Sequence, residues 1–495
     1  MAKRPGFRTA VLMAAAAGAA LGWEGRARAD GGPAVTWVES EAGAYWQAQA
    51  APDFSTPGSG APATISVSTG PMLQRIDGFG GAVSELGWQA IQKASPADQT
   101  NVINSLFGAN GCNLNMARVP IGSSDFALGY YSDDDSPGDY NLKHFSIGRD
   151  QQNLIPFLKA AQQAHSNLQV WGVPWTPPAW MKTSNIYYGG SLTNTPQIMT
   201  TYANYLADWA QAYEGQGINV MAVAPQNEPG VSQTYPSCIW TASQLDTFIG
   251  SYLGPALQAK GLNTGVWLGT LDGFNGGSTS IPNVVLADST ARSYITGAAF
   301  QYSAEGSIPG VHQLDPGIEL VQSESIVTDA SNPWSDGQAL FGEMKSYFDA
   351  GANEYFNWNM VLNETGQSNW GWAQDCMVTV NQTSGQVTYN PDYYVMRHFS
   401  QFVQAGAHEV SSTSSGGVQD IAFVNPDGST VVVAYNGSSF GEVTAIDVGN
   451  QELDVTLDAG SVSTFVIAAP EPGTVGVVLV AAGGLLLRRR AGRRF

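Results

Sequence analysis

The sequence predicts an α/β protein, a (β/α)8 or TIM barrel with an attached antiparallel β-sandwich, and two patterns predict it. Between residues 75 and 400, short apolar runs alternate with amphipathic helical segments, and this alternation is typical of a parallel sheet. Eight such runs match the eight strand–helix units of a closed barrel. Beyond residue 403 the runs are short and rich in Val and Thr, with Gly, Asn and Asp between them, which is typical of a sandwich.

The eight apolar runs are the expected barrel strands, and most of them end in polar or aromatic residues. They cover residues 75–82, 114–120, 168–175, 220–228, 265–270, 294–302, 318–324 and 354–359. Helical patterns such as 96–108 and 200–213 lie between them. Because barrels of this type build their sites at the carboxyl ends of the strands, the residues that end these runs are the candidates for function.

The chain divides into five expected segments. They are a secretory signal (1–29), N-terminal strands that join the β-sandwich (30–74), the barrel (75–402), the β-sandwich (403–469) and a sorting signal (470–495). The strands before the barrel are expected to complete the sandwich that follows it, which would place both ends of the folded body together.

Composition excludes several functions. The net charge is −20, and ten of the 21 Lys and Arg residues lie in the two terminal signals, so the body between them is strongly acidic. Such a body repels phosphate backbones, and we expect no nucleic-acid partner. Three widely spaced Cys (112, 238 and 376) and five His without HxH or HExxH spacing predict no metal site and no cofactor.

Both ends of the chain indicate export. A basic start, an apolar stretch at 10–23 and Ala-Arg-Ala at 27–29 are typical of a secretory signal, the alternative being an uncleaved anchor. At the other end, Pro-Glu-Pro (470–472), an apolar run of 15 residues (473–487) and an Arg cluster follow one another. This end resembles a PEP-CTERM sorting signal, the alternative being a plain C-terminal anchor.

The two signals imply processing partners and a location. The N-terminal signal implies cleavage by signal peptidase, and the PEP-CTERM resemblance implies transient anchoring in the membrane and cleavage by an exosortase-like protease. The expected location is the cell surface or extracellular matrix of a Gram-negative-type bacterium.

Glu228 and Glu324 are the main chemical lead, because they end the fourth and the seventh run. Strands four and seven lie on opposite sides of a closed barrel, so their ends can aim two carboxyl groups across its mouth. Two carboxyl groups about 5–5.5 Å apart can cleave a glycosidic bond, with one as nucleophile and the other as acid. The alternative is that both are solvated surface acids, as most acids are. Glu319 and Glu343 fit less well, because neither ends a run.

Long motifs in a fixed order resemble glycoside hydrolase family 30 over roughly residues 70–468. The matching stretches are GFGGAVSELGW (78–88), ARVPIGSSDFALGYYS (117–132), GDYNLKHFSI (138–147), VPWTPPAWMKT (173–183), PQNEP (225–229), YPSCIWT (235–241), WNMVLNETGQSNWGW (358–372) and YNPDYYVMRHFSQFV (389–403). The resemblance implies a barrel with a β-sandwich, Glu228 as acid/base and Glu324 as nucleophile. It also implies a sugar subsite lined by Asp125, Trp175, Asn227, Tyr302, Trp358 and Asn359.

These side chains have chemistry that suits a sugar. Asn227 can hydrogen-bond the 2-hydroxyl, and Asp125 can accept hydrogen bonds from other hydroxyls. Trp175, Trp180 and Trp358 offer flat apolar faces to a pyranose, although ordinary core packing is the alternative for each Trp.

Two further points concern the neighbours of the nucleophile. Arg118, near the end of the second run, is expected to pair with Glu324 and keep it ionised, or else to form a structural ion pair. The sixth run ends in Phe300-Gln301-Tyr302, whereas relatives often carry His-Trp-Tyr. With Phe300 in place of a hydrogen-bonding His, this wall of the site is expected to differ from theirs.

The function expected from the sequence is retaining hydrolysis of neutral β-glucosidic linkages, of the β-1,6-glucan type, by two-carboxylate double displacement. The substrate is then an oligo- or polysaccharide. Alternatives within the family are a glucosylceramidase, which acts on a glycolipid, and a β-xylosidase. An alternative of another class is a non-catalytic carbohydrate-binding protein of the cell surface.

Overall fold

The computed structural model describes residues 33–469 apart from 56, 59 and 274–276. The two expected export signals, 1–29 and 470–495, lie outside the described residues. Among the helices that are described, none combines the length and the apolar character that crossing a membrane requires.

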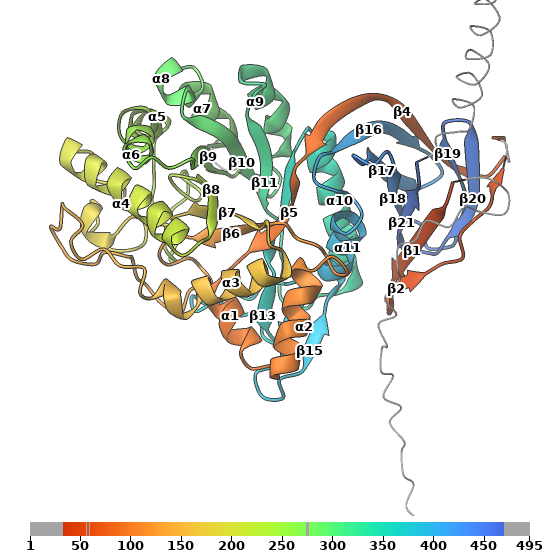
Figure 1. Ribbon diagram of the computed structural model, residues 1–495, viewed down its shortest axis with the longest axis horizontal. Coiled ribbons are helices and arrows are strands. Elements are labelled where there is room, and N and C mark those ends of the chain that lie inside the picture. Colours follow the sequence, from red (N-terminus) through yellow and green to blue (C-terminus); the bar gives the residue numbers. More distant parts are fainter. Residues whose placement is uncertain (1–32, 56, 59, 274–276, 470–495) are drawn as a thin grey trace, which may run out of the picture.

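Eight parallel strands close into a barrel, which confirms the expected fold class (Figure 1). In chain order the strands are β5 (Gly78–Ala82), β6 (Met116–Pro120), β7 (Gln169–Val173), β8 (Asn219–Val223), β9 (Gly265–Leu271), β10 (Ile295–Gln301), β11 (Glu319–Glu324) and β12 (Glu354–Asn359). Each overlaps one of the eight apolar runs, although β8 ends at Val223, so Glu228 lies beyond the strand that it was expected to end. The barrel closes where β12 pairs with β5.

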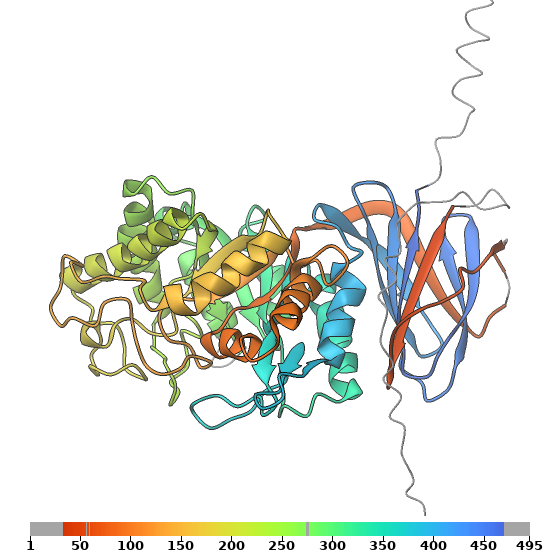
Figure 2. The same ribbon diagram turned by 60° about the horizontal axis from the view of Figure 1, so that its bottom comes forward.

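Helices surround the barrel on its outer face (Figures 1 and 2). The α-helices are α1 (Glu85–Ile91), α2 (Pro96–Phe107), α3 (Leu154–Ala164), α4 (Pro196–Gly215), α5 (Ala242–Phe248), α6 (Gly254–Ala259), α7 (Gly277–Val285), α8 (Ser289–Arg292), α9 (Ile308–Leu314), α10 (Trp334–Asp349) and α11 (Pro391–Ser400). Short 3-10 turns occur at Asp150–Gln152, Ala179–Met181 and Glu305–Ser307, and a π-helical turn at Ile249–Leu253. The start of α2 and of α4 is set by a Ser or Thr cap followed by Pro.

The β-sandwich contains strands from before and after the barrel. They are β1 (Val35–Glu41), β2 (Ala44–Ala48), β3 (Phe54–Ser55), β4 (Ala63–Ile76), β16 (Ala407–Ser414), β17 (Val418–Val424), β18 (Thr430–Asn436), β19 (Glu442–Val448), β20 (Gln451–Leu457) and β21 (Val462–Ile467). β1 pairs with β21, so the two ends of the body lie side by side.

Three details of the fold differ from the sequence-based expectation. β4 and β19 pair in parallel within an otherwise antiparallel sandwich, because no hairpin connects them and their directions are therefore not tied. Arg75 and Ile76, expected in the first barrel strand, belong to β4. A small sheet of β13 (Val361–Asn363), β14 (Val378–Val380) and β15 (Val387–Tyr389) follows the barrel and was not expected.

The sandwich packs against the barrel through α11. His398 of this helix is fully buried, and its ring nitrogens lie 2.8 Å from Oγ1 of Thr464 in β21 and 2.9 Å from Oγ of Ser40 in β1. Burial, followed by the charge of Arg397, lowers the pKa of His398 to about 3, so the imidazole is neutral. This contact ties the last barrel helix to both chain ends of the sandwich.

Candidate active site

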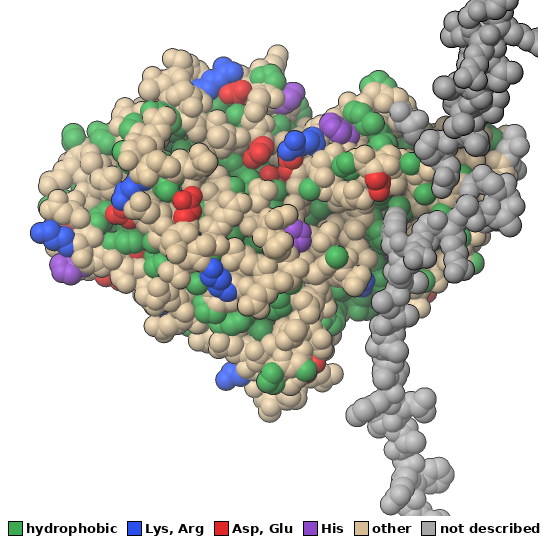
Figure 3. All heavy atoms as spheres, viewed as in Figure 1, with side chains coloured by type: hydrophobic (Ala, Val, Ile, Leu, Met, Phe, Trp, Pro, Cys, Tyr) green, Lys and Arg blue, Asp and Glu red, His purple; other side chains and the backbone are tan. Residues whose placement is uncertain are grey.

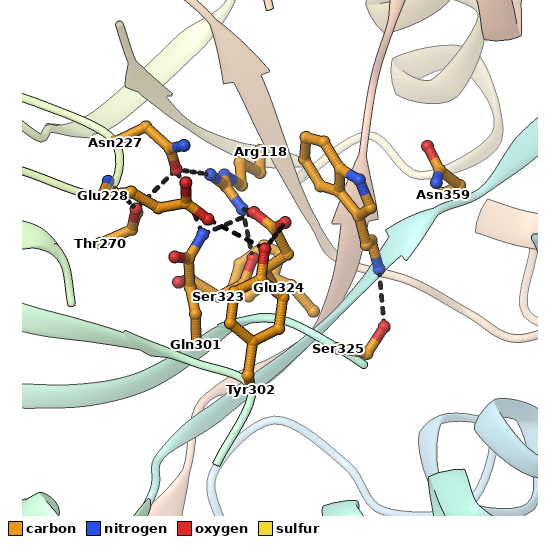
Figure 4. A network of polar contacts seen from close by, with 12 residues as sticks. Arg118, Asn227, Glu228, Thr270, Gln301, Tyr302, Ser323, Glu324, Ser325 and Asn359 are labelled. Atoms are coloured by element: carbon orange, nitrogen blue, oxygen red, sulfur yellow. Dashed lines mark hydrogen bonds and ion pairs between the residues drawn. The ribbon is translucent and has the colours of Figure 1, made fainter. Parts of the chain in front are cut away.

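Glu228 follows β8 and Glu324 ends β11, and the structure brings their side chains together at the carboxyl end of the barrel (Figure 4). The hydroxyl of Tyr302 lies 2.9 Å from Oε1 of Glu228 and 2.7 Å from Oε1 of Glu324. The Oε1 atoms of Glu228 and Glu324 both contact this hydroxyl, so the distance between them cannot exceed the sum of the two contact distances. This matches the roughly 5–5.5 Å of retaining glycosidases and falls short of the roughly 6.5–9.5 Å of inverting ones.

The backbone is unusual at two of these residues. Glu228 has a φ of 45° and Tyr302 a φ of 53°, in the left-handed region that residues other than glycine seldom occupy. The amide of Glu228 donates to the carbonyl of Thr270, and the amide of Tyr302 donates to the carbonyl of Glu324. Backbone held in such a conformation costs about 1–3 kcal/mol per residue and is concentrated at functional sites. Here it turns both side chains toward each other.

Glu324 forms an ion pair with the guanidinium of Arg118. Nη1 of Arg118 lies 2.6 Å from Oε2 of Glu324, and Nε2 of Gln301 donates to the same oxygen at 2.5 Å. Arg118 is completely buried, and its guanidinium lies over the rings of Trp175 and Trp358, 4.8 and 4.7 Å from their centroids. A buried guanidinium requires a counter-charge, so this arrangement favours an ionised Glu324.

Asn227 is held in one orientation by three donors. Its Oδ1 accepts hydrogen bonds from Nη2 of Arg118 at 2.5 Å, from Oγ1 of Thr270 at 2.6 Å and from Nε2 of Gln301 at 3.1 Å. Within the described part of the chain, no acceptor is found for its Nδ2. The amide nitrogen is therefore available to donate to a hydroxyl of a bound sugar.

Glu228 differs from Glu324 in its surroundings. Burial first, and then the charges of Glu324 and Asp272, raise the pKa of Glu228 to about 7, while hydrogen bonds from Tyr302 and Tyr235 oppose the shift. Tyr302 has a single hydroxyl hydrogen and two carboxyl groups in reach, so one of its two contacts requires a proton from a carboxyl group. Glu228, with its raised pKa, is the group that holds this proton near neutral pH.

Three of the other candidates surround the two carboxyl groups. Trp175 and Trp358 stack with their ring centroids 5.5 Å apart, and both are almost completely buried. Asp125 is 5% exposed, and its Oδ1 has no hydrogen-bond partner among the described residues. Burial and then the charges of Glu324 and Glu228 raise the pKa of Asp125 well above its usual range.

Two candidates lie elsewhere. The ring nitrogen of Trp180 donates to the carbonyl of Asp134, and its ring packs against Tyr140, so no contact joins it to the carboxyl pair. Asn359 donates from Nδ2 to Oε1 of Gln374 at 2.8 Å, and Figure 4 shows it well to one side of Glu228 and Glu324. Asn359 was assigned to the site by the family resemblance, and Trp180 by the flat apolar face of its ring, and neither argument fixes where a side chain packs.

Sequence reasoning did not assign roles to Gln301, Tyr235 and Thr270. We expected Phe300 to alter one wall of the site, but its side chain lies in the core between the barrel strands and the helices. Successive residues of a strand face opposite sides, so Gln301 takes the position inside the barrel mouth. Tyr235, whose hydroxyl donates to Oε2 of Glu228 at 3.1 Å, stands in the quoted YPSCIWT motif and could have been found there.

The chain belongs to glycosyl hydrolase family 30. Residues 76–403 match the TIM-barrel domain of this family, and residues 406–465 match its β-sandwich domain. The chain is therefore a glycoside hydrolase, and in this family the hydrolysis of β-glycosides proceeds with retention.

Known proteins of similar sequence and structure agree with this family. The lysosomal acid glucosylceramidase of Mus musculus is 31% identical over 392 residues, which cover 74% of this chain and 76% of that protein. The endo-1,6-β-D-glucanase BGN16.3 of Trichoderma harzianum is 28% identical over 472 residues, 88% of this chain and 94% of that protein. The crystal structure of SrfJ from Salmonella typhimurium has a TM-score of 0.82 and 28% identity, and covers 88% of this chain and 99% of that one.

The raised pKa of Glu228 predicts the pH profile. Above about pH 7, kcat/KM is expected to fall by about tenfold per pH unit, because the ionised group cannot protonate the leaving oxygen. The measurement is kcat/KM from pH 4 to 10 with a disaccharide. A glucoside with a nitrophenolate leaving group, which departs without a proton, is the control and should fall less steeply. A disaccharide profile that stays flat to pH 9 would contradict the assignment of Glu228.

Proposed function

We propose that this glycosidase cleaves neutral β-glucan chains of the β-1,6 type by double displacement at Glu324 and Glu228. The observation that carries the mechanism is the hydroxyl of Tyr302 between the two carboxyl groups, which sets their spacing. Glu324 attacks the anomeric carbon and forms a glycosyl-enzyme, while Glu228 gives its proton to the leaving oxygen. Glu228 then takes a proton from the water that attacks the anomeric carbon and releases Glu324. Two inversions leave the β-configuration unchanged.

The remaining residues support this mechanism. Asn227 donates to the 2-hydroxyl of the sugar at the cut, a contact that strengthens in the transition state. Asp125 accepts from another hydroxyl of the same ring. Arg118 keeps Glu324 ionised and in position through their ion pair while the glycosyl-enzyme forms and breaks. Trp175 and Trp358 form the apolar side of this subsite.

The substrate class is supported by aromatic rings that continue from Glu228. We call them the aromatic platform; its members are Tyr130, Tyr187, Tyr188, Trp370 and Trp372. Tyr235, which donates to Glu228, packs against Trp372 with centroids 4.9 Å apart. The hydroxyl of Tyr130 donates to the carbonyl of Thr234, next to Tyr235.

Four rings of the aromatic platform meet at Tyr130, which contacts Tyr187, Tyr188 and Trp370, while Trp372 packs against Tyr235. The ring of Tyr130 stacks on Tyr187 at 5.4 Å and meets Trp370 edge-on at 5.4 Å. Tyr130 is 39% and Tyr188 42% exposed. Because the acid protonates the leaving oxygen, the side of the site next to Glu228 receives the leaving group. Half-exposed rings with hydroxyls suit further sugar units of a chain.

The two relatives support two different substrates, a β-1,6-glucan and a glucosylceramide-type glycolipid. The relative of Trichoderma harzianum, named as an endo-1,6-β-D-glucanase, matches nearly the whole folded body. The glucosylceramidase of Mus musculus has the higher identity over a shorter stretch, which keeps a glucosylceramide-type glycolipid as the second candidate. The aromatic platform, with its polar edges, favours the glucan.

The roles of the two glutamates are tested by matched amide variants. Glu324→Gln is expected to lower kcat by about 10⁴-fold or more on every substrate, because no nucleophile remains. Glu228→Gln is expected to lower it by about 10²–10⁴-fold on a disaccharide, with recovery when azide, a nucleophile that needs no base, is added to an activated aryl glucoside. The products are followed by NMR. An initial α-product, or full turnover by Glu324→Gln, would refute the mechanism.

The aromatic platform is tested by chain length. Trp370→Ala and Tyr188→Ala are expected to raise KM roughly 3–10-fold for a β-1,6-linked hexasaccharide and to leave KM for the disaccharide unchanged, because only the longer chain reaches the rings. Phe440→Ala, which removes an exposed ring from the sandwich, is the matched control. Equal losses on both substrates, or faster hydrolysis of glucosylceramide than of any glucan, would contradict the glucan proposal.

We also propose that the enzyme is exported and processed at both ends. The basic and apolar start with Ala-Arg-Ala at 27–29 supports cleavage by signal peptidase. The PEP-CTERM-like end at 470–495 supports a transient anchor cut by an exosortase-like protease, which leaves the enzyme at the cell surface or in the matrix. Mass spectrometry of the protein from the native host locates both ends. An intact C-terminus in released protein would rule out this processing.

A further inference from the structure

Three carboxyl groups meet at the end of the barrel that lies opposite the active site. Glu319 is the first residue of β11, Glu354 is the first residue of β12, and Asp77 directly precedes β5. These three strands are neighbours in the barrel. One oxygen of each carboxyl group lies within 4.8 Å of the other two. Among the described residues, no other group of acid, His or Cys side chains meets this spacing.

Glu354 sets this cluster apart from an ordinary patch of acids. Its side chain is 0% exposed, and neither carboxyl oxygen has a hydrogen-bond partner in the described part of the chain. Its place at the start of β12, with Phe356 two residues further inside the barrel, directs it into the barrel interior. A buried carboxyl group without partners is unfavourable unless a cation or a proton neutralises it.

The protein supplies little positive charge here. Arg75 is the one basic residue among the described residues that line the adjoining cavity, and its Nε lies 2.6 Å from Oδ1 of Asp77. Its side chain is 60% exposed, and no ion pair to Glu319 or Glu354 is found in the described residues. Burial, followed by the neighbouring carboxyl groups, raises the pKa of Glu354 well above its usual range. Beside the three acids the described residues place one guanidinium, that of Arg75, and the imidazole of His408, whose charge acts on Asp77.

The space beside the acids is large enough for an ion and its water. A cavity of about 430 Å³ is lined by the three acids, Arg75, Asn115, Gln169, Met116, Met221, Ala405 and Gly406. Calcium takes six to eight oxygen ligands at about 2.3–2.6 Å, so two of its ligands can be up to roughly 5 Å apart. The spacing of the carboxyl oxygens fits this range. An all-oxygen set without His or Cys disfavours zinc.

We propose that Asp77, Glu319 and Glu354 bind a calcium-type divalent cation at the amino end of the barrel. Asp77 links sandwich strand β4 to barrel strand β5, and the amide of Gly406 donates to the carbonyl of Ile76, the last residue of β4. The ion therefore joins β11, β12 and the junction of the two domains. Its role is structural, and it is independent of the chemistry at the other end of the barrel.

The test is the melting temperature of the full chain, freed of metal with EDTA, during titration with CaCl2 at pH 7.5. Saturating calcium is expected to raise Tm by roughly 3–8 °C, because the ion binds only the folded state. Calorimetry on the same protein should show one site. Glu354→Gln and Glu319→Gln should each abolish the shift, and both keep the size and shape of the side chain.

Glu409→Gln is the matched control, because Glu409 is another buried glutamate, in β16, that accepts a hydrogen bond from Gln74 and lies outside the cluster. This variant should respond to calcium as the wild type does. The proposal is overturned if calcium leaves Tm unchanged, which would mean that protons neutralise the cluster. It is also overturned if the shift survives in Glu354→Gln or is as large with MgCl2 at the same concentration.

Discussion

The active site depends on the buried ion pair of Arg118 and Glu324. A guanidinium without exposure to water requires a counter-charge. Glu324 supplies it, and the carbonyl of Ser323 and Oδ1 of Asn227 accept from the same guanidinium. These three acceptors come from β11 and from the loop after β8. Arg118 therefore links opposite sides of the barrel mouth and fixes their relative positions.

The same pair explains how two identical side chains take opposite roles. Glu324 has Arg118 and Gln301 on one oxygen, which favours the charged form. The side chain of Glu228 has hydroxyl partners alone among the described residues, from Tyr302 and Tyr235, and the charge of Glu324 acts on it. The environment therefore favours different protonation states in two identical side chains, as the proposed roles of nucleophile and proton donor require.

Buried acids at the two ends of the barrel differ in the positive charge that lies next to them. At the carboxyl end, Arg118 reaches into the barrel and neutralises Glu324. At the amino end, Glu354 is just as deeply buried, and the nearby Arg75 remains at the surface with Asp77. Figure 3 shows red and blue side chains next to each other between the barrel and the sandwich, on a surface where charged side chains are otherwise scattered. The first arrangement gives a preorganised active site, and the second leaves negative charge that an ion can satisfy.

The sequence by itself determined the barrel, the sandwich and the pair Glu228 and Glu324, because strand periodicity and the ends of strands are local properties of the chain. Tertiary structure decided which neighbours act with them. Gln301 faces the site and Phe300 does not, and Trp175 and Trp358 pack on Arg118 while Trp180 packs elsewhere. It also decided the parallel pairing of β4 with β19. Such contacts join segments far apart in the chain, and their geometry follows from packing that no local pattern records.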